Sequence, residues 1–240
     1  MSKEKIIVAL DVTTAAEAHE IIAELGGEIG AFKIGLQLFT VAGASFVREV
    51  VASGIKIFLD VKFYDIPNTV AKASIEAARL GVWMFNIHAL GGSEMMRMTV
   101  ENVREFCDKE SLPLPKIIGV TVLTSANQET LSEIGIETEI NGQVMNLAKL
   151  SAKCGLDGVV ASPREVGLIR RNIEKKDFLI VTPGIRPTFA TNDDQKRVMT
   201  PAEAIENGAD YLVIGRPITQ AENKISAVRK VLEEIKAASA

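Results

Sequence analysis

Short apolar, β-branched runs recur along the chain of 240 residues, and segments with helical periodicity separate them. Eight runs have the length and composition of buried strands: residues 6–10, 32–35, 55–61, 84–89, 116–123, 158–162, 178–184 and 211–216. Apolar residues recur at helical spacing between these runs, for example in 14–25, 42–53, 69–81 and 225–236. Strand and helix therefore alternate throughout the sequence.

This alternation predicts parallel strands joined by right-handed helical crossovers. An open eight-stranded sheet would normally carry a glycine-rich dinucleotide-binding turn after its first strand. The first turn here, ALDVTTAAE, contains no glycine, and GGEIG at 26–30 precedes a strand instead of following one. We therefore predict an α/β protein with one domain, a (β/α)8 TIM barrel spanning residues 1–240.

Composition and charge limit the possible partners. The chain is 47% hydrophobic, enough for one full-sized core, and its net charge of −4 comes from interspersed acids and bases. No basic face is expected for nucleic acid or anionic lipid, and no run is long enough to predict a membrane span or a signal peptide. The isolated Cys107 and Cys154 are typical of reduced thiols. We predict a cytoplasmic protein with no nucleic-acid or membrane partner.

In barrels of this type, the active site lies where strands end and the following loops begin. The polar residues expected there are Asp11, Lys33, Asp60, Lys62, His88, Thr121, Thr124, Ser162, Arg186 and Arg216. Any one of them alone could be a helix cap or a solvated loop charge. Asp11 is not needed as a cap, because Thr14 and Glu17 already predict a capping box. His88 and Ser162 are interpreted as structural polar residues.

The stretch FLDVKFYDIPNTV, at 58–70, has an unusual density of charge for a buried strand. Because strand side chains alternate in direction, Asp60 and Lys62 are predicted on the same face, looking into the barrel mouth. Buried charges persist only when paired, so Lys33 from the adjacent strand is expected to join them. Such a cluster at a barrel mouth is more typical of a working site than of a structural salt bridge. Asp65 falls beyond the strand end.

Two later segments indicate a phosphate site. VTPGIRP (181–187) and VIGRP (213–217) end the seventh and eighth predicted strands, where barrels commonly bind phosphate through glycine amides and a helix N-terminus. Arg186 and Arg216 would add charge-assisted contacts. The polar segment between them, 188–201, is long for a loop and is interpreted as a mobile lid.

DVKFYDIPNTV resembles the signature of the orotidine 5'-phosphate decarboxylase family, and the resemblance extends over the whole chain. ALDV, FKIG, NIHA with GG, VTVLTS, TPGIRP and IGRPI also match it. The pattern DxKxxD is shared with related sugar-phosphate decarboxylases and aldolases, whereas the continuation IPNT is more specific. The resemblance implies loss of CO2 from orotidine 5'-phosphate to give uridine 5'-phosphate in pyrimidine synthesis, without cofactor or metal.

The resemblance also implies residue roles. Lys62 would stabilise the C6 carbanion and protonate it, within a catalytic set of Lys62, Asp60, Lys33 and Asp65. The implied substrate-binding residues are Asp11, Lys33, Asp60, Ile66, Pro67, Asn68, Thr69, Thr124, Arg186, Gln195, Gly215 and Arg216. Asp65 and Thr69 would enter the partner's site in a homodimer.

Two alternatives stay open at this point. The first is a sugar-phosphate decarboxylase or aldolase of the same superfamily that uses Mg2+ and an enediolate. Against it stand IPNT and the absence of an added carboxylate after the fourth strand, in NIHALGG. The second is a non-catalytic phosphate-binding barrel, against which stands the intact charge set.

Overall fold

The computed structural model describes residues 3–190 and 198–237. Its sheet is a closed barrel of eight parallel strands in sequence order, closed by β8 pairing with β1. The strands are β1 (Ile6–Ala9), β2 (Ala31–Gly35), β3 (Ile57–Phe63), β4 (Met84–His88), β5 (Lys116–Val120), β6 (Gly158–Val160), β7 (Leu179–Thr182) and β8 (Tyr211–Ile214). The predicted TIM barrel is confirmed.

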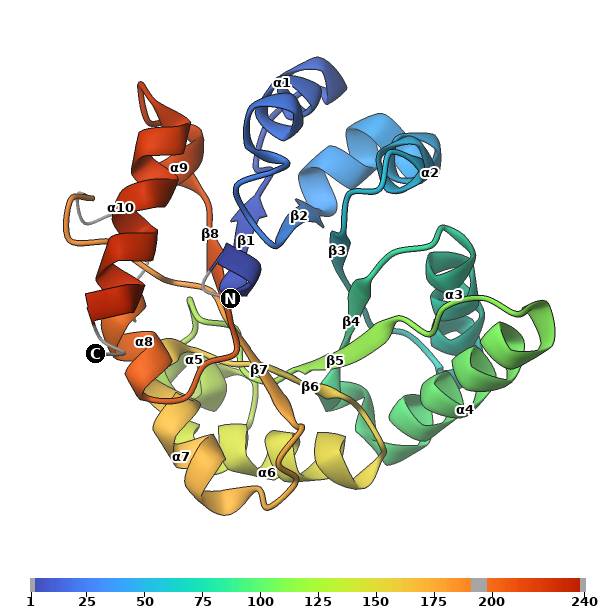
Figure 1. Cartoon of the computed structure of the whole chain (residues 1–240). Coiled ribbons are helices and arrows are strands. Elements are labelled where there is room, and N and C mark those ends of the chain that lie inside the picture. Colours follow the sequence, from blue (N-terminus) through green and yellow to red (C-terminus); the bar gives the residue numbers. More distant parts are fainter. Residues whose placement is uncertain (1–2, 191–197, 238–240) are drawn as a thin grey trace.

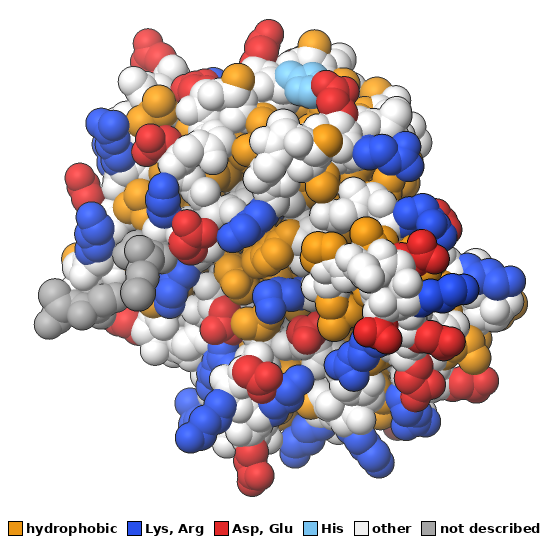
Figure 2. All heavy atoms as spheres, turned by 45° about the vertical axis from the view of Figure 1, so that its right-hand side comes forward, with side chains coloured by type: hydrophobic (Ala, Val, Ile, Leu, Met, Phe, Trp, Pro, Cys, Tyr) orange, Lys and Arg blue, Asp and Glu red, His pale blue; other side chains and the backbone are white. Residues whose placement is uncertain are grey.

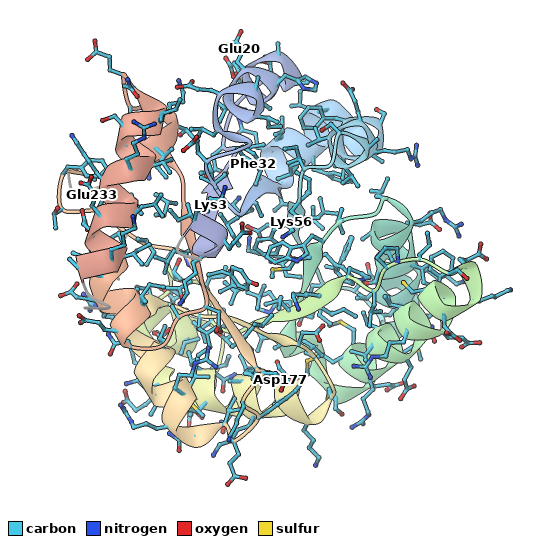
Figure 3. All side chains as sticks on the ribbon, in the orientation of Figure 1. Lys3, Glu20, Phe32, Lys56, Asp177 and Glu233 are labelled. Atoms are coloured by element: carbon cyan, nitrogen blue, oxygen red, sulfur yellow. The ribbon has the colours of Figure 1, made fainter. Side chains whose placement is uncertain are left out.

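Helices form a ring around the strands (Figure 1). They are α1 (Ala15–Leu25), α2 (Leu36–Ala52), α3 (Pro67–Arg79), α4 (Gly92–Glu110), α5 (Gln128–Glu133), α6 (Ile140–Lys153), α7 (Val166–Asn172), α8 (Pro201–Glu206), α9 (Arg216–Thr219) and α10 (Lys224–Ala237). Three 3-10 turns, η1 (Lys3–Lys5), η2 (Ala89–Gly91) and η3 (Pro163–Glu165), complete the described elements. Figure 3 shows Lys3 and Lys56 near the centre of the ring, where β1 and β3 begin, and Glu20 and Glu233 on its outer helices.

The apolar pattern divides the core into two layers. Residues that face outward from the strands pack against the apolar faces of the helices in one large buried cluster. A smaller cluster is drawn only from alternate strand positions and fills the barrel interior: Ile7, Ala9, Ala31, Phe58, Met84, Ile118, Val181 and Val213. The barrel interior is therefore filled at this level, and an open cavity lies beyond it, toward the C-terminal ends of the strands.

Two local predictions need correction. Thr14 caps α1 by accepting a hydrogen bond from the Glu17 backbone N–H, but the Glu17 carboxylate accepts chiefly from the N–H and hydroxyl of Thr13 and only weakly from the Thr14 backbone, so the reciprocal half of the predicted capping box is shifted by one residue. The helix predicted from residue 42 begins at Leu36. It includes Gly43 in a non-helical conformation with φ 71°, which interrupts the regular apolar spacing.

Side chains of both charge signs are interspersed over the face shown in Figure 2, with hydrophobic side chains gathered near its middle. In the described part of the chain, no helix is both long and apolar enough to cross a membrane.

Candidate active site

Polar side chains stand directly above the apolar interior of the barrel, on three neighbouring strands, β2, β3 and β4, and just after the end of β1. The apolar residues are Ala9, Ala31, Phe58 and Met84. Two positions further along the chain from each lie Asp11, Lys33, Asp60 and Asn86. Because side chains two positions apart on a strand share a face, the sequence itself builds a polar layer on top of the apolar one.

Three of these groups form an alternating row of charges with Lys62. The Lys33 ammonium lies 3.2 Å from Asp11 Oδ1 and 3.4 Å from Asp60 Oδ2, and the Lys62 ammonium lies 2.7 Å from Asp60 Oδ1. The side chains of Lys33 and Asp60 are only 11% and 14% exposed. As the sequence predicts, Lys33, Asp60 and Lys62 come together, each carboxylate beside a cation.

Asp60 remains ionised in this setting. Burial alone would raise the pKa of its carboxyl group, but the charges of Lys33 and Lys62, with hydrogen bonds from Lys62 and Asn86, lower the pKa below its ordinary value. A buried anion is thus held ready between two cations at physiological pH.

The backbone of β3 is irregular where it carries these charges. Phe58 and Leu59 pair with β4 in regular register, which then shifts before pairing resumes at Phe63. Lys62 has φ 50°, in the left-handed region that lysine rarely adopts. Asp60 and Lys62 do meet, but the structural reason predicted for it, regular alternation of side chains along β3, is wrong. Such a conformation costs about 1–3 kcal/mol and is typical of functional sites.

Asn86 is a site residue that the sequence analysis missed. Its side chain is fully buried, its Oδ1 accepts a hydrogen bond from the Lys62 backbone N–H at 2.8 Å, and its Nδ2 donates to Asp60 Oδ1 at 2.6 Å. The available signal was a lone amide within the apolar run MFNIH of β4. Buried polar side chains need partners, so such a residue predicts a nearby polar group.

The charged row forms part of the wall of an open cavity of about 250 Å³ at the C-terminal ends of the strands. Thr124 after β5, Arg186 after β7, and Gly215 and Arg216 after β8 line it as well. A Cβ atom at Gly215 would lie 3.3 Å from Asp11 Oδ2, so glycine keeps this wall open. One cavity thus brings together the predicted charges and both predicted phosphate-binding arginines.

Other predicted residues lie elsewhere. Asp65 is exposed and its Oδ1 accepts a hydrogen bond from the Ile66 N–H, while Pro67 begins α3. None of residues 65–69, which include Asn68 and Thr69, belongs to the described lining of the cavity. Gln195 and most of the predicted lid lie outside the described residues.

His88 and Ser162 act as caps of short turns. His88 Nδ1 accepts from the Leu90 N–H at 3.4 Å, and the Ser162 hydroxyl accepts from the Arg164 N–H at 3.3 Å. Burial and then the Lys62 charge lower the pKa of His88. Over residues 3–190 and 198–237, no group of three or more His, Cys, Asp and Glu side chains could hold a metal ion.

The sequence matches the model of the orotidine 5'-phosphate decarboxylase / HUMPS family over residues 4–231. It is 54% identical to an orotidine 5'-phosphate decarboxylase of Syntrophotalea carbinolica, over 99% of this chain and 97% of that protein, and 53% identical to one of Geobacter sulfurreducens, over 98% of each. The structure is similar to that of an orotidine 5'-phosphate decarboxylase from Lactobacillus acidophilus, with a TM-score of 0.84 and 36% identity over 96% and 98% of the two chains. The structure is also similar to that of an uncharacterized conserved protein from Geobacillus kaustophilus, with a TM-score of 0.83 and 32% sequence identity over 96% of this chain and 99% of that chain.

Proposed function

We propose that this chain, which belongs to the orotidine 5'-phosphate decarboxylase / HUMPS family, is a carboxy-lyase that converts orotidine 5'-phosphate to uridine 5'-phosphate and CO2. The observation that carries the proposal is the buried row of Lys33, Asp60 and Lys62 in one cavity with Arg186 and Arg216. A charge array suited to a carbanion and a pair of cations suited to a phosphate fit a nucleotide that loses a carboxylate.

The proposed chemistry is electrostatic. When the bond from C6 to the carboxylate breaks, CO2 departs and the electron pair stays on C6 in the plane of the ring, where no conjugation absorbs it. The Lys62 ammonium stabilises this pair and transfers a proton to C6, which completes the product. Lys33 and Asp60 hold Lys62 in place, 2.7 Å separating the Lys62 and Asp60 groups. The fixed charges need no reorganisation during the reaction, which is the main source of such stabilisation.

The rest of the cavity binds the nucleotide. Asp11, 3.2 Å from Lys33, accepts hydrogen bonds from ribose hydroxyls, and Thr124 bonds the pyrimidine. Arg186, Arg216 and the backbone at Gly215 bind the phosphate, since guanidinium groups match phosphate oxygens in geometry and charge. Gln195, outside the described residues, is assigned by resemblance to the base and phosphate.

The active form is a homodimer in which Asp65 and Thr69 complete the partner's site, with Ile66, Pro67 and Asn68 beside the substrate. Support comes from exposed apolar side chains in the first part of α2 and in the segments after β3, β4 and β5: Leu36, Val41, Tyr64, Ile66, Leu90 and Leu123, which are 37–67% exposed. Apolar surface of this kind is typical of association. Asp65 lies in the same region and is not among the residues that line the cavity of its own subunit. Cytoplasmic location, expected from the sequence, stays a prediction.

One assay tests the function. Orotidine 5'-phosphate is followed by ultraviolet absorbance with the purified protein, before and after exhaustive chelation. We expect full decarboxylation in both cases. Activity lost on chelation and restored by Mg2+ would favour the sugar-phosphate alternative, and nucleotide binding without CO2 release would favour a non-catalytic barrel.

A further inference from the structure

The hydrogen-bond ladder between β3 and β4 is interrupted beside the charged row. Leu59 pairs with Phe85, and the next paired residues are Phe63 and Ile87, so β3 has three residues in the interval and β4 has one. That single residue is Asn86. Lys62 lies within the interval with its left-handed φ of 50°. Backbone groups in such a gap lose their partners across the sheet and need others.

The side chain of Asn86 supplies the partner for one of these backbone groups, the N–H of Lys62. The Oδ1 of Asn86 accepts a hydrogen bond from the Lys62 backbone N–H at 2.8 Å, and its Nδ2 donates one to Asp60 Oδ1 at 2.6 Å. The same oxygen of Asp60 accepts from the Lys62 ammonium at 2.7 Å. One amide therefore joins both ends of Lys62, its backbone directly and its ammonium through Asp60. The side chain of Asn86 is completely buried and cannot exchange these bonds for bonds to water.

We infer that Asn86 is a positioning residue for the decarboxylation, which holds the Lys62 backbone in the left-handed conformation and orients the Asp60 carboxylate between the two lysines. This inference rests on the proposed function. Without the Asn86 carbonyl, the Lys62 N–H has no partner to offset the unfavourable backbone conformation. Without the Asn86 NH2 group, Asp60 Oδ1 loses the donor that sets its rotation relative to Lys33 and Lys62.

The chemistry of the amide separates positioning from simple filling of space. Leucine has the same number and branching of side-chain heavy atoms as asparagine, although its methyl groups are bulkier, and it offers neither bond. Aspartate keeps the acceptor for Lys62 but places a negative oxygen against Asp60. Once protonated, however, that aspartic acid can donate to Asp60 through its O–H and accept from Lys62 through its carbonyl, as the amide does. Burial and the neighbouring charge would raise the pKa of an aspartate introduced there.

The first measurement compares Asn86→Leu with wild type for kcat and for the dissociation constant of uridine 5'-phosphate. We expect kcat to fall about 100-fold, the effect of a displaced catalytic group, while product affinity changes less than tenfold. Thr99→Val is the matched control, because Thr99 is equally buried and its hydroxyl bonds only the Met95 carbonyl within α4. It should lower thermal stability without lowering kcat.

The second measurement follows Asn86→Asp from pH 8 to pH 5.5, with wild type measured at each pH. We expect the deficit in kcat relative to wild type to shrink as pH falls, whereas the deficit of Asn86→Leu should not change. Deficits independent of pH in both variants, or kcat of Asn86→Leu within threefold of wild type, would overturn the inference. Turnover by the wild type tests the proposed function separately, because only the ratios of variant to wild type concern Asn86.

A measurement on wild type covers the case in which neither variant folds. In labelled protein, hydrogen exchange of the Asn86 side-chain NH2 and the Lys62 backbone N–H should be slow, as for buried and bonded groups. Exchange of either group at the rate of solvent-exposed amides would overturn the inference.

Discussion

Lys62 combines a strained backbone with a tightly held charge. Its φ of 50° is unfavourable, yet its ammonium lies 2.7 Å from Asp60 and its N–H is bonded to Asn86. Residues in sparsely populated conformations persist only where their surroundings determine them strongly. The unfavourable backbone conformation of Lys62 places its ammonium in the cavity wall and fixes it there before substrate binds.

Replacing Lys62 tests its role as proton donor. Lys62→Ala should lower decarboxylation at least about 1,000-fold, within the range for removal of a general acid that also stabilises charge. Binding of uridine 5'-phosphate should change far less, because Arg186 and Arg216 lie after β7 and β8, away from Lys62 on β3. Lys72→Ala, at an exposed position of α3, is the control and should turn over as wild type does. Near-normal turnover in Lys62→Ala would refute the assignment.

The lowered pKa of Asp60 predicts a pH dependence of stability. A carboxyl group whose folded pKa lies below its unfolded pKa stabilises the fold above the unfolded value, about 4, and loses this contribution as pH falls through the folded value. The free energy of unfolding of wild type should therefore exceed that of Asp60→Asn at pH 7 by about 3–5 kcal/mol, because the variant removes the carboxylate beside Lys62 and one of the two carboxylates beside the buried Lys33. Urea titrations at several pH values should show this difference decreasing below about pH 4. A constant difference would mean that Asp60 does not titrate as described.

Single residues were predictable where a simple rule governs them. The rule that buried charges are paired anticipates that Asp60, Lys62 and Lys33 meet, although the β3 backbone between Asp60 and Lys62 does not follow regular alternation. The left-handed Lys62 was not predictable, because the sequence offers no glycine there and the conformation depends on Asn86 from another strand. The main partner of the Glu17 carboxylate was also missed, since Thr13 and Thr14 offer it equivalent groups one residue apart.

At the scale of elements, the loop after β7 is fastened to the last helix. Glu234 of α10 accepts hydrogen bonds from the Thr188 N–H at 3.0 Å and from the Thr188 hydroxyl at 2.8 Å. Lys230, one turn earlier on α10, lies 5.4 Å from the centre of the Phe189 ring. Because Thr188 is two residues after Arg186, α10 helps to set where that arginine enters the cavity.

Removing the hydrogen bonds between Glu234 and Thr188 should weaken binding of the substrate phosphate. Glu234→Ala should raise KM for orotidine 5'-phosphate about three- to tenfold and leave kcat within about twofold, since bonds to a charged acceptor are worth roughly 1.5–3 kcal/mol. Glu233→Gln is the matched control, at the neighbouring exposed position on the outside of α10 (Figure 3). An unchanged KM in Glu234→Ala would show that Arg186 is positioned without α10.

Elements were predictable where hydrophobic periodicity is unbroken. All eight strands were identified, with ends displaced by a few residues. The start of α2 was missed, because Gly43 divides the helix into two segments and the first has an irregular apolar pattern. The shift of register between β3 and β4 depends on pairing between strands and has no local signature.

At the scale of the molecule, the proposed dimer predicts that inactive variants can restore each other. Lys62→Ala and Asp65→Asn homodimers should both be nearly inactive. Mixed in equal amounts after dissociation, half the dimers are heterodimers, each with one site carrying both lesions and one carrying neither. Activity should then recover to roughly a quarter of wild type. If heterodimers form, as mass measurement can verify, and activity stays at the level of the separate variants, the site is not shared.

The pairing of β1 with β8, which closes the barrel, has a consequence for synthesis on the ribosome. β1 pairs on one side with β2 and on the other with β8, at Ile6 with Leu212 and Ile7 with Val213. One edge of β1 must therefore stay without its partner while about 200 further residues are translated, roughly 10–40 s at 5–20 residues per second. An unpaired strand edge is a template for association with other chains. The nascent protein is thus exposed to aggregation from the synthesis of β1 until β8 emerges, so a chaperone would matter during nearly the whole of translation.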